Sequence, residues 1–182
     1  LTSASQDGYV TSSSTLADNN GAFKAFDNDP ATHMEFAYNA TAHYQTNTGN
    51  VDGGQATTGN IDGSGTYVGE WLQIQFPHKI VVSSYSLRNR LSPYNYRMPE
   101  HAKLLGSNNG TNWTTVYNHD DTGGGIYSGT GETRTFSFSS TTGYIYYRLV
   151  TNKLFTNTNN NVYDTPNIVS WQLYGTEENT GT

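Results

Sequence analysis

The sequence of 182 residues contains no cysteine and few charged side chains. The absence of cysteine excludes disulfide bonds, thiolate metal sites and a cysteine nucleophile, so a bound metal must be held by oxygen or imidazole. Charged residues form 13% of the chain, about half the usual share, and the net charge is -6. Only four residues are lysine, so we expect no basic patch for nucleic acid.

Long hydrophobic runs are also absent. The longest lies near Ile80–Val82, far short of the roughly 20 apolar residues of a membrane-spanning helix, so we expect no membrane insertion. Neutral polar residues dominate instead, with 26 Thr, 20 Asn and 16 Ser. A surface of this kind predicts an extracellular, cell-surface or virion-surface location. The 14 Tyr have large rings and supply enough apolar area for a core.

Short runs of alternating apolar and polar residues recur along the chain, and helical spacing is hard to find. The predicted strands are 71–76, 85–87, 102–106, 135–138, 144–150 and 170–174. Clusters of Gly, Asn and Asp between them favour tight turns. This alternation predicts an all-β fold, a two-sheet β-sandwich formed by one domain over residues 1–176.

Two segments, 33–69 and 153–167, are too long for simple turns. Because long loops in compact domains are often functional, we expect an enlarged loop over 33–69 that contributes to a site. Residues 177–182 are expected to form a tail or linker.

Five stretches of the chain carry a family likeness when they are taken together. They are 22–32 (AFKAFDNDPAT), 70–76 (EWLQIQF), 103–114 (KLLGSNNGTNWT), 146–149 (YYRL) and 171–175 (WQLYG). With these motifs the chain resembles the discoidin, or coagulation-factor C-type (F5/8 type C), superfamily, and within it the family 32 carbohydrate-binding modules. Each motif alone is weak, but the five follow the family's order over nearly the whole chain. The resemblance implies an eight-stranded jelly-roll β-sandwich with ligand loops at one end.

The segment 24–32 offers oxygen donors of the kind that calcium prefers: two carboxylates, a threonine hydroxyl and backbone carbonyls in a tight turn. On the local sequence alone, an Asx-type turn is the commoner explanation of this segment. The resemblance implies a structural calcium ion instead. It assigns as ligands the carbonyl of Lys24, the carboxylate of Asp27, the carbonyl of Asp29, both oxygens of Thr32 and a backbone oxygen of Val169. Ser170 stands where the family has Glu, so one formal charge is missing and we expect a weaker site.

Sugar recognition needs planar hydrogen-bonding groups, an aromatic face and a concave surface on a rigid scaffold. Arg90 and Asn95 lie five residues apart in a predicted loop after a strand. Modules similar to this one use such an Arg and Asn to bind galactose-type hydroxyls, and they place an aromatic platform at a position that corresponds to Tyr163. A surface arginine with a local hydrogen bond and a tyrosine that caps the core are the alternative interpretations of Arg90 and Tyr163.

The chain departs from the family just after Thr32, where relatives often carry Trp and then His. Here His33 and Glu35 occupy this region, so the family's usual galactose preference does not transfer directly. We expect His33 and Glu35 to contact the ligand, with Tyr38 and Tyr94 rebuilding the site. Further candidates from the same loops are His43, Tyr44 and Tyr96. We assign Trp71, Trp113 and Trp171 to packing, and His78, His101 and His119 to the surface.

Catalytic motifs are not found in the sequence. No carboxylate pair stands in a glycosidase-like motif, and there is no nucleophile elbow, zinc-protease helix or phosphate loop. We therefore predict that the chain is not an enzyme but a carbohydrate-binding, lectin-like module, which attaches a larger protein or viral particle to a glycan surface. The alternative is a protein-interaction, adhesion or structural domain of a virion or cell-surface protein, with a protein receptor as partner. Weak binding at each site would suit a larger multidomain or multicopy assembly.

Overall fold

The computed structural model describes residues 1–15, 21–36, 44–45, 47–156 and 164–178. Within these ranges it contains eleven β-strands, two short 3-10 helices and no α-helix, and no helix is long and apolar enough to cross a membrane. The strands are β1 (Ser5–Gln6), β2 (Tyr9–Ser13), β3 (Met34–Glu35), β4 (Thr57–Ile61), β5 (Gly65–Val68), β6 (Glu70–Asn89), β7 (Pro99–Ser107), β8 (Thr114–Asp120), β9 (Thr133–Ser137), β10 (Tyr144–Leu154) and β11 (Asn167–Glu177). The helices are η1 (Ala22–Ala25) and η2 (Thr122–Gly124).

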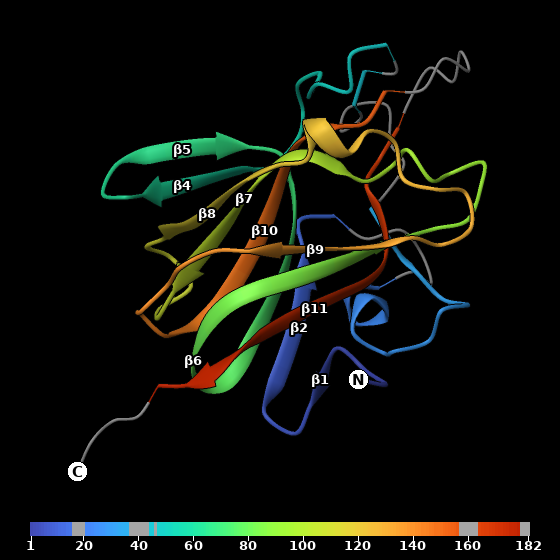
Figure 1. Ribbon diagram of the computed structural model, residues 1–182. Coiled ribbons are helices and arrows are strands. Elements are labelled where there is room, and N and C mark those ends of the chain that lie inside the picture. Colours follow the sequence, from blue (N-terminus) through green and yellow to red (C-terminus); the bar gives the residue numbers. More distant parts are fainter. Residues whose placement is uncertain (16–20, 37–43, 46, 157–163, 179–182) are drawn as a thin grey trace.

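The long strand β6 belongs to both layers of the fold. Its first half pairs with β2 and β10 in the order β1-β2-β6-β10-β7-β8, and its second half pairs with β11 and β9 in the order β3-β11-β6-β9. All pairs between these strands are antiparallel. Figure 1 shows β9, β6 and β11 in front of β10, β7 and β8. The predicted all-β sandwich is confirmed.

Two strands that were predicted separately, 71–76 and 85–87, are parts of this single strand. Pro77 stands between the two predicted strands, and proline has no N–H to donate to a ladder. It lies between the two paired halves of β6, where the missing donor breaks no ladder bond. The strand therefore passes from one sheet to the other through its proline.

The main core lies between the two layers. Tyr85, Leu87 and Trp171 come from β6 and β11, and they face Leu104 and Tyr147 from β7 and β10. All five side chains are fully buried, and each large apolar side chain removed from water contributes about 1.5–3 kcal/mol. The assignment of Trp171 to packing is therefore confirmed.

The segment 33–69 is not one loop, as predicted, but contains β3 and the antiparallel hairpin β4–β5. The hairpin covers the outer face of the sheet, where Ile61 packs with Trp113, Leu105 and Val150 in a second small core. Trp71 packs against this cluster and is partly buried. The hairpin provides the apolar cover that this face of the sheet would otherwise lack.

The predicted tail begins too early. Strand β11 continues to Glu177, and the next residue, Glu178, donates its N–H to the Lys79 carbonyl and accepts the Gly143 N–H. Residues 179–182 lie outside the described part of the chain.

Candidate ligand-binding site at one end of the sandwich

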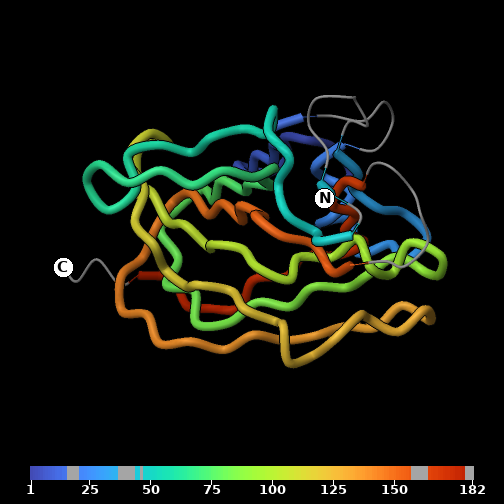
Figure 2. Tube along the Cα trace, turned by 90° about the horizontal axis from the view of Figure 1, so that it is seen from above, coloured from blue at the N-terminus to red at the C-terminus, as the bar shows by residue number. Residues whose placement is uncertain are grey.

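Three loops meet at one end of the sandwich: residues 27–33 after η1, 90–98 after β6, and 121–132 between β8 and β9. The second and third lie side by side in both views, and the Ser92 N–H donates to the Gly129 carbonyl at 3.0 Å (Figures 1 and 2). Short β3 pairs with β11 and brings residues 33–35 to the same end. The sandwich thus presents loops that are far apart in sequence as one surface.

Two asparagines tie the loop 90–98 to the loop 121–132. The buried side chain of Asn89 donates from Nδ2 to the Arg90 and Ser128 carbonyls, each at 2.8 Å. Asn95 donates from Nδ2 to the Tyr127 carbonyl at 2.6 Å. These bonds replace the ladder that ends at Asn89, so the loops are held without regular secondary structure.

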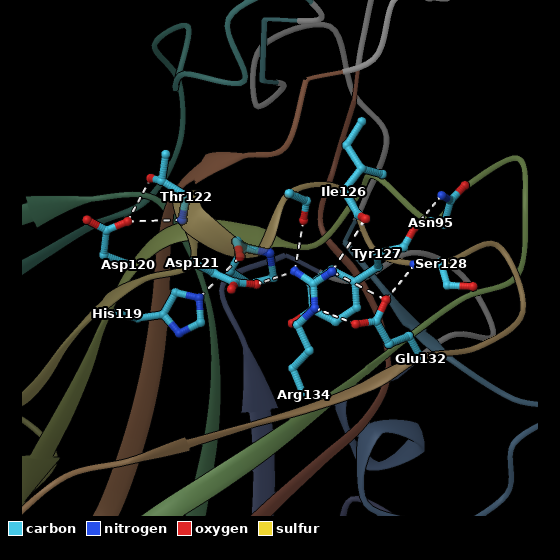
Figure 3. A network of polar contacts seen from close by, with 12 residues as sticks. Asn95, His119, Asp120, Asp121, Thr122, Ile126, Tyr127, Ser128, Glu132 and Arg134 are labelled. Atoms are coloured by element: carbon cyan, nitrogen blue, oxygen red, sulfur yellow. Dashed lines mark hydrogen bonds and ion pairs between the residues drawn. The ribbon is translucent and has the colours of Figure 1, made fainter.

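Arg134 on β9 fixes the inside of the loop 121–132 (Figure 3). Its guanidinium contacts the Asp121 carboxylate at 2.7 Å and the Glu132 carboxylate at 2.6 Å, and it lies 3.9 Å from the centroid of the Tyr127 ring. It also donates to the Gly125 carbonyl. Burial raises the pKa of Asp121, although Arg134 opposes this shift. One cation therefore holds two carboxylates and the backbone of the loop in a fixed arrangement.

A pocket of about 580 Å³ opens between these loops and residues 30–33. Its walls include Thr32, His33, Arg88, Arg90, Tyr94 and Gly131. Of the residues that the sequence indicated as ligand contacts, His33, Arg90 and Tyr94 line this pocket together. A hollow of this volume on a rigid end of a sandwich has the size of a small-ligand site.

Behind the pocket, Arg97 joins two carboxylates from distant parts of the chain. Its Nη1 lies 3.2 Å from Glu35 Oε1, and its Nε lies 3.1 Å from Asp164 Oδ1. Glu35 Oε2 is 3.5 Å from His33 Nε2. His33 and Arg97 hold the pKa of Glu35 below its usual value, although partial burial opposes the shift. Glu35 does not line the pocket and instead orients His33 from behind.

Tyr94 and Asn95 do not have the ligand-binding roles that the sequence predicted for them. Tyr94 lines the pocket, but the Arg90 guanidinium lies 4.2 Å from its ring centroid and that of Arg97 lies 4.9 Å away. The ring thus positions arginine instead of offering a free platform for a sugar. Asn95 is not among the lining residues, because its amide donor is committed to the neighbouring loop.

The remaining aromatic candidates fall into two groups. Tyr44 and Tyr96 are buried, and their hydroxyls donate to the Thr151 carbonyl and to Asp164, so neither is available to a ligand. Tyr38, His43 and Tyr163 lie outside the described residues.

The segment predicted to bind calcium forms a compact turn with Asn28 at a φ of 59°. The Thr32 hydroxyl lies 2.6 Å from Asp27 Oδ2 and 3.3 Å from the Asp29 carbonyl, so three assigned oxygens converge. Asp27 Oδ1 and Asp29 Oδ1 also accept backbone N–H groups within the turn, as in an Asx turn. Both sequence interpretations are therefore compatible with this geometry.

The other assigned calcium ligands lie on either side of this turn. Val169 and Ser170 on β11 share a hollow of about 180 Å³ with Asp29, and Lys24 lies in η1 just before the turn. Among the described residues no three His, Cys, Asp or Glu side chains cluster in a way that would hold a metal. A calcium shell here would depend on carbonyl and hydroxyl oxygens, which calcium accepts.

Sequence reasoning missed Arg88 and Arg97. Arg88 precedes Arg90 by two residues at the end of a strand, and this spacing places both side chains on the same face. That signal was available in the sequence. The pairing of Arg97 with Glu35 and Asp164 spans 62 and 67 residues, and no local pattern reveals it.

A protein-family model described as a NedA-like, galactose-binding domain of the F5/8 type C group matches residues 49–149. No curated protein is similar enough in sequence to count as a match. Solved structures of similar fold include a family 32 carbohydrate-binding module of Clostridium perfringens NanJ in complex with galactose. That module is 13% identical, with 93% of this chain and 96% of that chain covered and a TM-score of 0.58.

Two further structures have the same fold. A second family 32 module from Clostridium perfringens, in complex with GalNAc-β-1,3-galactose, is 11% identical, with 92% and 95% of the two chains covered and a TM-score of 0.58. A fucolectin from striped bass (Morone saxatilis) serum is 14% identical, with 96% of this chain and 49% of that chain covered and a TM-score of 0.60. Identities this low show a shared fold and no more.

Proposed function

Because the chain belongs to the F5/8 type C family of galactose-binding domains, we propose that it is a non-catalytic, lectin-like module that binds a glycan in the pocket between residues 30–33, 88–94 and 131. The observation that carries the proposal is the convergence of His33, Arg90 and Tyr94, all indicated by the sequence, on one pocket. The galactose bound to the NanJ module supports a sugar as the ligand of this pocket.

The chemistry of the pocket suits sugar hydroxyls. The Arg90 guanidinium lies over the Tyr94 ring, which fixes its plane while its N–H edge is available to acceptors. Asn89 Oδ1 is buried and has no hydrogen-bond partner among the described residues, and Asn89 lines the pocket. Because an unpaired buried polar group is costly, a ligand hydroxyl that donates to Asn89 Oδ1 would stabilise it.

A glycan array in millimolar calcium tests the proposal, with wild type and Arg90→Ala compared side by side. We expect wild type to bind a defined group of sugars and Arg90→Ala to lose most of the signal. Lys79→Ala, which removes a cation in the middle of β6, is the matched control and should bind like wild type, because Lys79 lies at the end of the β6–β11 pairing that is opposite to the pocket. If the folded wild-type protein binds no glycan, or if Arg90→Ala binds equally well, the proposal is wrong.

A protein ligand is the second candidate, and one observation favours it. Leu91 and Ile126 are 57% and 49% exposed on the two adjacent loops, and exposed apolar side chains at loop tips suit protein docking. Ile126→Asp distinguishes the candidates, because Ile126 is exposed and does not line the pocket. A glycan module should keep its array signal in this variant, whereas a protein-docking module should lose its partner in a pull-down.

The biological setting that we propose is extracellular or on a cell or virion surface, where the module would attach a larger protein or particle to glycans. Single lectin sites bind weakly, and several linked copies gain avidity through effective concentration. A tandem fusion of two copies should therefore bind a glycan-coated surface at least tenfold more tightly than one copy. Equal binding by one and two copies would contradict this part of the proposal.

The proposal also includes a structural calcium ion at the turn 27–32. Its ligands would be oxygens of Lys24, Asp27, Asp29, Thr32, Val169 and Ser170. The convergence of the Asp27, Asp29 and Thr32 oxygens supports this assignment. The ion would supply positive charge that holds the turn, and the turn in turn forms one wall of the pocket.

A further inference from the structure

Arg88 and Arg90 are two cations on one pocket that the protein itself does not neutralise. Both line the pocket, and neither has a carboxylate within 4.0 Å among the described residues. The contrast with the two other arginines at this end is clear, because Arg97 and Arg134 each contact two carboxylates. Outside the described ranges the sequence contains only one carboxylate, Asp18.

The surroundings of Arg88 explain why it has no carboxylate partner. Its cross-strand partners are Ser170 on β11 and Thr133 on β9, so hydroxyls stand where an acidic side chain would neutralise it. Gly131, with a φ of 87°, lies against its guanidinium, and a Cβ added there would lie 3.3 Å from Arg88 Nη2. These neighbours of Arg88 therefore carry no negative charge.

The nearest carboxylates do not cancel this charge. Glu35 is paired with Arg97, and it acts on Arg90 only at longer range. Asp29 shares the smaller hollow with Arg88, but its Oδ1 accepts the Ala31 N–H. Two guanidinium groups thus remain available at one concave surface, and guanidinium forks match carboxylate and sulfate oxygens in pairs of hydrogen bonds.

We infer that the glycan bound in this pocket is acidic and that Arg88 and Arg90 hold its carboxylate or sulfate group. This inference rests on the proposed glycan-binding function and narrows it to sugars that carry a uronic-acid carboxylate or a sulfate ester. It also explains how an acidic protein with net charge -6 presents a positive site. The positive charge of the two arginines is concentrated in one pocket and is not spread over the surface.

The test compares matched sugars that differ only in charge: the methyl glycosides of galactose, galacturonic acid and galactose 6-sulfate, together with an array of neutral, uronic and sulfated glycans. We expect a charged member of a matched set to bind roughly tenfold or more tightly than its neutral counterpart, as one strong charge-assisted hydrogen bond allows. The preference should shrink when NaCl is raised from about 50 to 500 mM, because salt screens exposed charges.

Arg88→Gln removes the charge and keeps a planar donor, and it should reduce the ratio of acidic to neutral affinity roughly tenfold. Ser170→Glu, measured in EDTA so that the new carboxylate cannot bind calcium, supplies the missing cross-strand carboxylate and should reduce the same ratio without deleting an arginine. Lys79→Gln makes the same charge change as Arg88→Gln in the middle of β6, at the opposite end of the pairing with β11, and should leave the ratio at the wild-type value. Circular dichroism would verify that each variant is folded.

The outcomes separate this inference from the proposed function. A preference for the charged sugars that is weaker in Arg88→Gln than in wild type supports the inference. The acidic group is then identified by whichever sugar, the uronic acid or the sulfate ester, wild type binds more tightly. If the neutral sugar binds as well as its charged partners, or if Arg88→Gln keeps the preference, the inference is wrong while glycan binding stands. If no glycan of any charge binds, both are wrong.

Discussion

The imidazole of His119 lies in the core, so its assignment to the surface, made because the histidines lack ligand spacing, is wrong. Its Nε2 lies 3.2 Å from the Pro99 carbonyl, which can only accept, so Nε2 carries the proton. Nδ1 then accepts the hydroxyl proton of Tyr85 at 2.5 Å. Burial lowers the pKa of His119 from 6.5 to about 4. The neutral ring is therefore part of the folded structure.

This pKa shift predicts a pH dependence of stability. Between pH 6.5 and about 4 the unfolded chain binds a proton at His119 and the folded chain does not, so stability is lost as the pH falls through this window. The loss should amount to about 3 kcal/mol. Urea unfolding at pH 7, 5.5 and 4.5 should show the stability advantage of wild type over His119→Gln shrinking by about 2 kcal/mol, because pH 4.5 lies above the pKa of the folded protein.

The matched control for this measurement is His78→Gln, because His78 is an exposed histidine beside Glu177. Its difference from wild type should change much less over the same pH range. A wild-type advantage over His119→Gln that is independent of pH would contradict the buried neutral ring.

At the scale of elements, one arginine links the hairpin β4–β5 to the sheet that it covers. The Arg148 guanidinium lies between two tryptophans, 3.8 Å from the Trp71 centroid and 4.2 Å from that of Trp113. It donates to Gln73 on β6 and, at 3.2 Å, to the Thr58 hydroxyl on β4. Burial lowers the pKa of Arg148 to about 10. This side chain connects the hairpin to the sheet that it covers.

Arg148→Ala should therefore loosen the hairpin before the core. We expect the free energy of unfolding to fall by about 2 kcal/mol, from the lost hydrogen bonds and cation–π contacts. Hydrogen exchange should accelerate in β4 and β5 more than in β6. Arg148→Lys keeps the charge but lacks the planar guanidinium. Its free energy of unfolding and its exchange rates in the hairpin should therefore lie between those of wild type and Arg148→Ala. Unchanged exchange in the hairpin would show that the apolar cluster alone holds it.

The elements that the sequence predicted correctly are those with alternating burial. Strands β7, β9, β10 and β11 and both halves of β6 place apolar residues on one face, and the period-two pattern shows it. Strands β2 and β8 were missed because polar residues form most of each strand, and their pairing with neighbouring strands determines their structure. Tertiary pairing overrides local preference at such positions.

In the candidate site, too, local sequence predicted some features and tertiary contacts determined the others. Arg90, His33 and Tyr94 were found from local motifs and the family resemblance, and all three line the pocket. The contacts that orient them come from residues distant in sequence, such as Arg97 with Asp164. Local sequence motifs indicate which residues face a ligand. The packing of the loops decides which polar groups of those residues remain available to bind it.

At the scale of the whole molecule, most of the arginines and the acidic turn 27–32 lie at the same end of the sandwich. Four of the five arginines, 88, 90, 97 and 134, belong to the strands and loops around the pocket. Asp27 and Asp29 lie in the adjoining turn, whose residues 30–33 form a pocket wall. Anything that fixes this turn should therefore also fix the pocket.

Calcium provides the test of this coupling. With a dissociation constant of about 0.1–1 mM, as in extracellular modules, 5 mM calcium should stabilise the fold by about 1–2 kcal/mol. The melting temperature should rise by roughly 2–8 °C over that in EDTA. Glycan affinity should increase in parallel, because the turn 27–32 leads directly into His33. Magnesium should have less effect, since it prefers a smaller and more regular shell.

Asp27→Asn separates ion binding from a simple Asx turn. The amide keeps an acceptor oxygen for the backbone but removes the charge, so the turn can form while calcium affinity falls. In this variant we expect the melting temperature and the glycan affinity to be the same in calcium and in EDTA. If wild type already behaves in this way, the hydrogen bonds of Asp27, Asp29 and Thr32 hold the turn by themselves, and the pocket wall needs no metal.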